Sequence, residues 1–427
     1  MGRLIIALCC VVVTTASGQF KNIKLAEEVE GVSAVPSLGT SITISQKDPK
    51  NIVVGIGPNR AVYTLDGGNT WSESLLQSPF GAQGDPALIS DLKGHICYLH
   101  LSGVEPQLDR IVCQRSEDRG KTWDAGSFIG NNPPAAQAKA WLTVHPKKQI
   151  MYATWTQFDK YGIDDVNCHS NILFSISTNG GGKWHKPVQI SQTPGDCQDG
   201  EKTSEGAVPA VGINGRIYVT WANQGIIFFD RSYNGGETWL TNDIPITKQL
   251  GGWSMEIPGL KRASGRPVLM IDNSPSRAQG SLYVAFADQK DGPDNTDIWF
   301  TRSTSRGDNW VKPIRVNSDD SRTHQFMPWM TVDQTTGRIY IIYYDRREHE
   351  DLQTDVYLAF SSDGGNVFKE VKISETPFAP TDAKPFSENT NIAAFAGIVT
   401  PVWTRMDNGK LSVWTAVIKE DDLLELK

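Results

Sequence analysis

A dense cluster of charged side chains lies in the segment YYDRREHEDLQTD, which begins at Tyr343. Arg346 and Arg347 are suited to bind sulfate or uronate groups, because a guanidinium can donate two parallel hydrogen bonds to such an anion. Asp345 beside them could act as a general acid or base. The alternative interpretation is a solvated loop whose local ion pairs contribute little to stability.

Two further carboxylates, Glu205 and Asp85, stand close to the start of apolar stretches. Hydrolysis of a glycosidic bond uses two carboxyl groups, which are about 5 Å apart in retaining enzymes and about 6.5–9.5 Å apart in inverting ones. The catalytic candidates are therefore Glu205, Asp85 and Asp345. The expected substrate-binding residues are Arg60, Arg266, Arg346, Arg347, His324 and Arg405.

Two other polar features have both a functional and an ordinary interpretation. His324, beside Gln325, could act as a general base, or it could be a histidine without a catalytic role. The segment DQKDGPDNTD, from Asp288 to Asp297, could bind calcium through its hard oxygen atoms. An Asx-rich turn explains the same composition. No other cofactor is expected.

An internal repeat indicates which elements position these residues. Six octapeptides follow the pattern Ser/Thr-x-Asp-x-Gly-x-x-Trp with a few replacements: TLDGGNTW from Thr64, SEDRGKTW from Ser116, STNGGGKW from Ser177, SYNGGETW from Ser232, STSRGDNW from Ser303 and SSDGGNVF from Ser361. The short polar side chain can close a turn, and the glycine allows the positive φ that such a turn needs. The aromatic residue is expected to be buried between neighbouring sheets.

Each octapeptide lies inside a longer module of four short strands, and these modules predict an all-β propeller. A seventh module, which starts at NIAAFAG, has no octapeptide and lacks its outer strand. The segment FKNIKLAEE from Phe20 echoes FKEVKISET from Phe368, so we expect the N-terminal strand to complete the last blade and close the ring. The expected fold is a seven-bladed β-propeller, with six blades as the alternative.

In a propeller of this kind, the loops between blades and the loops between second and third strands gather on one face around the central channel. The inter-blade loops would bring Asp85, Lys139, Glu205, Arg266, His324, Gln325 and Asn389 to this face. The other loops would bring Arg60, Arg110, Asp159, Asp288, Asp297, Asp345, Arg346, Arg347, Asp355 and Arg405.

The six octapeptides resemble the Asp-boxes (bacterial neuraminidase repeats) of the sialidase superfamily, and this resemblance covers nearly the whole chain after residue 18. In that family the boxes are scaffold and lie on the face away from the active site. The resemblance places Glu205 at the position of the family's glutamate and Arg60 at that of a family arginine. The arginine of the family's Phe-Arg-Ile-Pro motif is replaced by Ala34 in SAVPSLG, and alanine cannot clamp a carboxylate.

The sequence therefore favours a sialidase-like hydrolase acting on an exposed, anionic glycan. The missing motif arginine leaves two alternatives open, namely a propeller that binds a glycan or a protein without catalysis, and a polysaccharide lyase on the same scaffold. The family's tyrosine nucleophile has no assigned counterpart, since Tyr343 and Tyr344 lie on a strand where we expect them to pack.

The N-terminus and the charge suggest where the protein acts. Residues 1–18 have the layout of a secretory signal, with Arg3, an apolar run and a small-residue site at Ala16-Ser17-Gly18. Residues 19–427 are then a single propeller domain, secreted to an extracellular or periplasmic compartment. The net charge of −7 argues against nucleic acid as a partner. A carbohydrate ligand, no membrane span and a monomeric state are expected.

Four cysteines follow the signal segment, and an even number in an exported protein favours disulfides. Cys97 and Cys113 lie on two strands joined by a short loop, so antiparallel pairing would put them side by side. Cys168 and Cys197 would then form the second bridge and pin long loops over the functional face. Four free thiols are the alternative.

Overall fold

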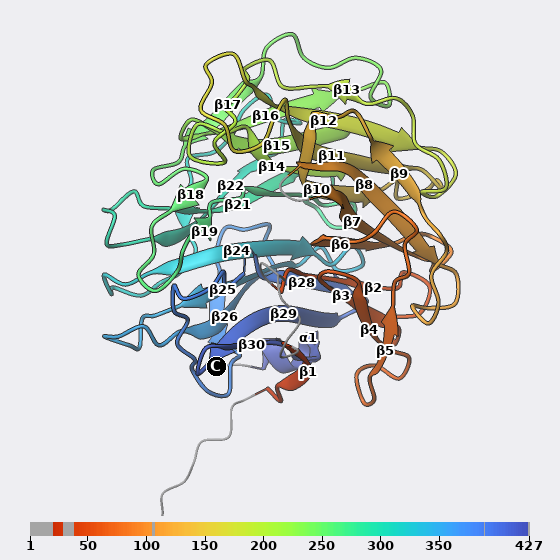
Figure 1. Cartoon of the computed structure of the whole chain (residues 1–427). Helices are drawn as coiled ribbons and strands as arrows, with labels where there is room; N and C mark the ends of the chain where they lie inside the picture. Colours follow the sequence, from red (N-terminus) through yellow and green to blue (C-terminus); the bar gives the residue numbers. More distant parts are fainter. Residues whose placement is uncertain (1–19, 29–37, 105–106, 388, 426–427) are drawn as a thin grey trace, which may run out of the picture.

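The computed structural model describes residues 20–28, 38–104, 107–387 and 389–425. Its strands form seven sheets arranged in a ring, which confirms the seven-bladed propeller and excludes the six-bladed alternative (Figure 1). The segment proposed as a secretory signal and the SAVPSLG motif up to Ser37 lie outside the described residues. In the described part of the chain, the helical structure is the short α1 (Glu420–Leu424).

Six blades are four-stranded antiparallel sheets whose strands follow one another from the channel outward. Blade 1 contains β2 (Thr40–Ile44), β3 (Ile52–Ile56), β4 (Arg60–Thr64) and β5 (Ser72–Leu75). Blade 2 contains β6 (Gly84–Ser90), β7 (Ile96–Val104), β8 (Gln107–Ser116) and β9 (Ser127–Gly130). Blade 3 contains β10 (Ala136–Val144), β11 (Met151–Phe158), β12 (Ser170–Ser177) and β13 (Val188–Gln189). Blade 4 contains β14 (Glu205–Val211), β15 (Ile217–Asn223), β16 (Ile226–Ser232) and β17 (Ile244–Lys248). Blade 5 contains β20 (Val268–Ile271), β21 (Leu282–Asp288), β22 (Asp297–Ser303) and β23 (Ile314–Arg315). Blade 6 contains β24 (Gln325–Val332), β25 (Ile339–Asp345), β26 (Asp355–Ser361) and β27 (Lys369–Lys372).

Blade 7 joins the two ends of the chain, as the echo between FKNIKLAEE and FKEVKISET predicts. Its strands are β28 (Asn391–Phe395), β29 (Ile398–Asp407), β30 (Lys410–Thr415) and the N-terminal β1 (Ile23–Glu27), with β31 (Ile418–Lys419) paired to β29. In Figure 1 the red β1 lies beside the blue β30, and Ile23 pairs with Thr415. The ring is therefore closed by hydrogen bonds between β1 and β30.

The six octapeptides form turns with one hydrogen-bonding pattern between the third and fourth strands of blades 1 to 6. In every turn the glycine N–H donates to the Ser or Thr hydroxyl of the first position, over 2.8–3.0 Å. The aromatic residue packs against the preceding blade in several turns, as the T-shaped pair of Trp239 with Phe174 of β12 illustrates. These turns lie at the end of the blades opposite to Glu205, so they serve as scaffold.

The inner strands of four blades carry a β-bulge near their first residues. The register shifts between Gly84 and Ala87, Ala138 and Trp141, Glu205 and Val208, and Phe326 and Trp329. The bulged residues Asp85, Lys139, Gly206 and Met327 have positive φ values of 51°, 52°, 75° and 51°. A bulge redirects side chains, and non-glycine residues in this region are strained, which is typical of functional positions.

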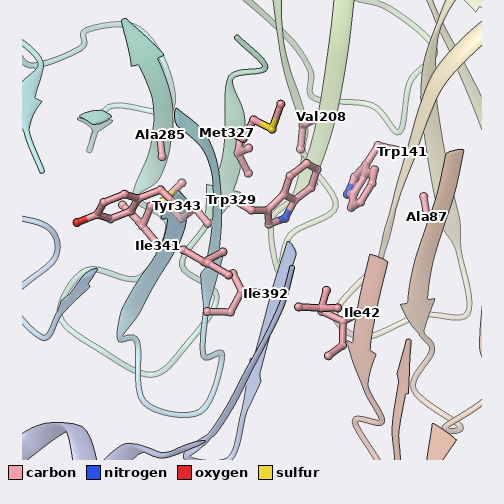
Figure 2. Close-up of a cluster of buried hydrophobic side chains, with 14 of the residues drawn as sticks. Ile42, Ala87, Trp141, Val208, Ala285, Met327, Trp329, Ile341, Tyr343 and Ile392 are labelled. Carbon is pink, nitrogen blue, oxygen red and sulfur yellow. The ribbon is translucent and has the colours of Figure 1, made fainter. Parts of the chain in front are cut away.

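Two tryptophans meet across the central channel and close it. The rings of Trp141 on β10 and Trp329 on β24 lie 4.2 Å apart between centroids. Figure 2 shows the two rings side by side, with Ile42 and Ile392 from β2 and β28 nearby. The channel is therefore filled by side chains at this level, and it does not form an open pore through the ring.

Both predicted disulfides are present. Cys97 on β7 is bonded to Cys113 on β8, and Cys168 is bonded to Cys197. The first bridge lies within one sheet, whereas the second joins the loop after β11 to the loop before β14. Within the described residues, we find no helix with the length and apolar character that a membrane crossing requires.

Candidate functional site

The candidate site lies at the end of the ring where the inner strands begin. Glu205 is the first residue of β14, and its side chain is completely buried. No described residue donates a hydrogen bond to either of its carboxylate oxygens. A buried carboxyl group without donors is costly when ionised, which marks this position as unusual.

A tyrosine, an aspartate and an arginine form a connected chain beside Glu205. The Tyr161 hydroxyl donates to Asp199 Oδ2 over 2.7 Å, and Arg262 Nη1 lies 2.7 Å from the same oxygen. Asp199 has a φ of 56°, so the backbone is held in the left-handed region to present this carboxylate. Tyr161 and Asp199 belong to the two loops that the Cys168–Cys197 bridge joins, which explains how residues 38 positions apart come together.

The two neighbouring carboxyl groups, of Glu205 and Asp199, have pKa values that are shifted in opposite directions. Burial and the charge of Asp199 raise the pKa of Glu205 well above its ordinary value. Burial also acts to raise the pKa of Asp199, but the charge of Arg262 and hydrogen bonds from Glu205 and Tyr161 bring that pKa below its ordinary value. Two adjacent carboxylates cannot both ionise easily, so Glu205 carries the proton and can donate it to an ionised Asp199.

Lys139 connects Glu205 to the second predicted carboxylate. Its Nζ lies 3.5 Å from Asp85 Oδ2, and its charge lowers the pKa of Glu205, in opposition to the effect of burial. Asp85 and Lys139 are two of the bulged residues with positive φ. The structure therefore brings Asp85 and Glu205 to one cluster, which we call the mouth cluster: Asp85, Lys139, Tyr161, Asp199, Glu205 and Arg262.

A hairpin between blades 4 and 5 covers the mouth cluster. It consists of β18 (Ser254–Met255) and β19 (Ala263–Ser264), which pair with each other. Trp253 packs so closely on Gly206 that a Cβ there would lie 2.5 Å from the indole ring. Arg266 follows the hairpin, is buried, and lies within 5.8 Å of the rings of Trp253, Trp141 and Trp329. The predicted residue Arg266 thus belongs to the channel mouth.

Asp345 and Arg347 belong to a different network, within blade 6. Arg347 donates to Asp345 Oδ2 over 2.8 Å and to Glu370 Oε1 over 2.7 Å. Burial raises the pKa of Asp345 to about 6, although Arg347 acts to lower it. Tyr343 donates to Glu370 and is completely buried. The contacts of Asp345 are with Gln325 and Arg347, so they do not connect it to Glu205 or Asp85.

Arg346 and His324 are adjacent to each other and are both buried. Arg346 donates to the Pro258 carbonyl of the loop between β18 and β19 over 2.8 Å, while its Nη2 has no hydrogen-bond partner among the described residues. Burial lowers the pKa of Arg346 to about 10. Burial and the Arg346 charge lower the pKa of His324 to about 4, so this histidine is neutral at pH 7.

Arg60 and Arg405 are held by carboxylates of their own blades. Arg60 donates to both oxygens of Glu73 over 2.8 and 3.0 Å, at the outer strand of blade 1. Arg405 donates to both oxygens of Asp407 over 2.8 Å each, within β29. Both arginines already make the two-pronged contact that a substrate carboxylate would need, so ligand binding there requires an exchange of partners.

The segment from Asp288 to Asp297 makes protein contacts with its two terminal carboxylates. Asp288 accepts from the Leu250 N–H over 2.8 Å, and Asp297 accepts from Asn317 over 2.7 Å. Over residues 20–28, 38–104, 107–387 and 389–425, no group of three or more His, Cys, Asp or Glu side chains is placed to hold a metal ion.

Three residues of the mouth cluster were missed in the sequence analysis: Tyr161, Asp199 and Arg262. Tyr161 and Asp199 lie near Cys168 and Cys197, and the predicted bridge over the functional face was the signal that pointed to them. Arg262 comes from the hairpin, and no repeat or motif in the sequence reveals that this hairpin lies over the channel.

Comparison with solved structures agrees with the fold. An ulvan lyase of polysaccharide lyase family PL25, solved with a bound glucuronate–sulfated rhamnose saccharide, is 13% identical with a TM-score of 0.56, over 94% of this chain and 96% of its own. The GH93 α-L-arabinofuranosidase of Fusarium graminearum is 12% identical with a TM-score of 0.53, over 96% and 100%.

A third structural neighbour is the NanB sialidase of Streptococcus pneumoniae, which is 11% identical with a TM-score of 0.51, over 87% of this chain and 84% of its own. No protein-family model matches the chain, and no curated protein matches it either. Identities this low establish a common fold and leave the chemistry to the residues of the site. By its fold, this chain is similar to the propellers found among carbohydrate-active enzymes.

Proposed function

We propose that the protein is a secreted, carbohydrate-active hydrolase that cleaves a glycosidic bond at the mouth cluster. The observation that carries this proposal is the hydrogen bond from Tyr161 to Asp199, with Arg262 orienting the carboxylate. A potential nucleophile bonded to a base, which is itself oriented by a third group, is the arrangement expected for covalent catalysis.

The proposed reaction uses three residues of the cluster. Tyr161 Oη attacks the anomeric carbon while Asp199 accepts the phenol proton, since the pKa of Tyr161 is raised by burial and by Asp199 and the free phenolate does not form at neutral pH. Asp85 protonates the departing oxygen. Water then attacks the anomeric carbon and gives its proton to Asp85, while the bond to Tyr161 Oη breaks and the proton on Asp199 returns to that oxygen. Glu205 holds Asp199 in place through its own proton.

Arginines near the mouth suggest an anionic substrate. Arg266 and Arg346 are both buried, and Arg346 retains one buried nitrogen without a partner among the described residues. A guanidinium held in this way can receive a carboxylate or sulfate group. Arg347, Arg60 and Arg405 bind Asp345, Glu73 and Asp407, so we assign them no first role in binding.

One observation favours a second function, which is glycan binding without catalysis. Glu205 is completely buried and Trp253 covers the adjacent Gly206, so a substrate reaches this carboxyl group only if the hairpin moves. A rigid propeller whose mouth stays covered would present its outer rim to a ligand. A lyase has no observation of its own in its favour, since its candidate base His324 is buried and hydrogen-bonded to Thr296.

The test is turnover of a panel of sialoside, uronate, sulfated and arabinan oligosaccharides by the full chain. We expect one class to be cleaved, with kcat lowered by about three orders of magnitude in Tyr161→Phe, which removes only the nucleophilic oxygen. Tyr233→Phe is the matched control, because Tyr233 is exposed in an octapeptide turn. Binding of a saccharide without turnover by the wild-type protein would instead establish the second function.

The two finer sequence assignments remain part of this proposal. We propose that the six turns are Asp-boxes of the sialidase superfamily, supported by their shared glycine-to-hydroxyl hydrogen bond. We propose that residues 1–18 are removed on export, and the two disulfides support an oxidising compartment. N-terminal sequencing of the exported protein tests the second assignment, with a first residue near Gln19 expected.

A further inference from the structure

A cavity of about 390 Å³ occupies the central channel at the end opposite to the mouth cluster. Its lining includes the last residues of six inner strands: Ile44, Val144, Val211, Ile271, Val332 and Phe395. The mouth cluster, in contrast, lies where the inner strands begin. The cavity is thus a second concave site, separate from the proposed active site.

The Trp141–Trp329 pair forms the floor between the two sites. Both indoles line the cavity, and the pair closes the channel with a centroid separation of 4.2 Å. In Figure 2 these rings stand above Ile42 and Ile392, which are also cavity residues. A ligand in this cavity therefore enters from the face opposite to the proposed active site.

The walls of the cavity are mainly apolar, and its volume suits a small molecule. Ligand sites in proteins commonly have volumes of about 300–1,000 Å³ and are lined by apolar side chains with a few polar groups. Here the polar groups stand near the rim, including Gln46, Asn273 and Gln334. An apolar body in the channel with a polar head at the rim fits this distribution.

The charge at the rim selects the head group. Lys147 is the one charged side chain among the residues that line the cavity, and it is exposed. Lys47 and Lys93 are exposed on neighbouring loops of the same face.

Of the nearby acidic residues, Asp48 lies 3.4 Å from Arg119, and Asp91, Asp272 and Asp333 accept hydrogen bonds from backbone N–H groups of their own loops. An anionic head is therefore favoured over a cationic one.

We propose that this channel cavity is a binding site for a carboxylate-headed amphiphile with an unbranched apolar chain of about ten carbons. The apolar chain of the ligand lies between the inner strands and reaches the indoles of Trp141 and Trp329. The carboxylate lies at the rim and pairs with Lys147. This inference does not depend on the hydrolase proposal, since the two sites share only the tryptophan floor.

The test is calorimetric titration of the full chain with decanoate, below the concentration at which decanoate forms micelles. We expect saturable binding with one site per chain. Lys147→Glu should weaken it by about tenfold, since a charged hydrogen bond is replaced by repulsion. Lys148→Glu is the matched control, because Lys148 is the exposed neighbour that does not line the cavity. Decyltrimethylammonium, with the opposite charge, should bind more weakly than decanoate.

A second variant tests where the apolar chain of the ligand lies. Ala394→Trp puts an indole into the cavity from β28 and should abolish decanoate binding. The proposal is overturned if decanoate does not saturate, if Lys147→Glu and Lys148→Glu weaken it equally, or if a folded Ala394→Trp protein binds as the wild type does. Should Ala394→Trp not fold, the contrast between the two lysine variants decides alone.

Discussion

Tyr161 and Asp199 are joined by a 2.7 Å hydrogen bond, and the Cys168–Cys197 disulfide links the same two loops. The disulfide therefore fixes the two loops relative to each other and supports the hydrogen bond between them. Arg262, from a third loop, completes the support. Three loops thus converge on the Asp199 carboxylate.

The second disulfide is expected to matter for activity more than the first. We predict that Cys168→Ser/Cys197→Ser lowers kcat/KM for the cleaved glycan by at least about tenfold, because Tyr161 and Asp199 lose their common anchor. Cys97→Ser/Cys113→Ser should keep kcat/KM, since that bridge lies within blade 2. Both changes should cost about 2–4 kcal/mol of unfolding free energy, measured by urea denaturation. Equal effects on kcat/KM would contradict the prediction.

Arg262 should act as a positioning residue whose loss changes the pH profile. Its charge helps to keep the pKa of Asp199 low, so Arg262→Ala should raise that pKa. Because the proposed mechanism needs Asp199 ionised, the acidic limb of kcat/KM should move upward by about one pH unit. Arg262→Lys should restore part of the original profile. Arg60→Ala, which removes the pair with Glu73 and the hydrogen bond to the Glu27 carbonyl, should leave the limb in place.

Two adjacent glycines of one octapeptide turn allow the conformational cost of a glycine substitution to be measured apart from its packing cost. Gly235 and Gly236 both have positive φ, at 75° and 93°. A Cβ at Gly235 meets nothing within 4 Å, whereas one at Gly236 would lie 2.4 Å from the Phe174 ring. Gly235→Ala should cost about 1 kcal/mol of unfolding free energy, from the backbone alone. Gly236→Ala should cost a further 1–3 kcal/mol, about what overpacking costs, in the same denaturation experiment.

Asp230 on β16 is expected to make stability depend on pH. Burial raises its pKa to about 7, so the folded protein holds a proton that the unfolded chain loses near its ordinary value of 3.8. The resulting contribution to stability is full below about pH 4 and is lost as the pH rises through 7. Asp230→Asn should therefore stabilise the protein at pH 8 by about 2 kcal/mol more than at pH 5.

Asp66 provides a control of the opposite sign for this experiment. Hydrogen bonds from Thr70 and Thr64 lower its pKa to about 2, so its contribution is present above about pH 4 and is lost as the pH falls through 2. Asp66→Asn should lower the melting temperature at both pH 5 and pH 8. A melting temperature of Asp230→Asn that follows the wild type at both pH values would show that Asp230 does not titrate in this range.

The sequence was sufficient for most of the fold because the relevant signals are local or repeated. The six octapeptides recur with their glycine in place, and the echo of FKNIKLAEE in FKEVKISET identified β1 as an outer strand. The Cys97–Cys113 pair followed from antiparallel strands across a short loop.

The site was less predictable because its members depend on loop conformations. Glu205 and Asp85 could be found, since both stand at the start of inner strands. For Asp199 the predicted bridge at Cys197 indicates only the loop, because its carboxylate is placed by a left-handed backbone and by the hairpin between blades 4 and 5. Asp345 and Arg347, two residues apart, satisfy each other, and charge density in the sequence does not reveal such local pairing.

The pairing of β1 with β30 also has a consequence for biosynthesis. During synthesis Ile23 is made long before its partner Thr415. The strand β1 must therefore wait, unpaired, until β30 has been synthesised, and blade 7 closes through a contact of very large sequence separation. Until then the growing ring has two open edges, each able to pair with the wrong strand.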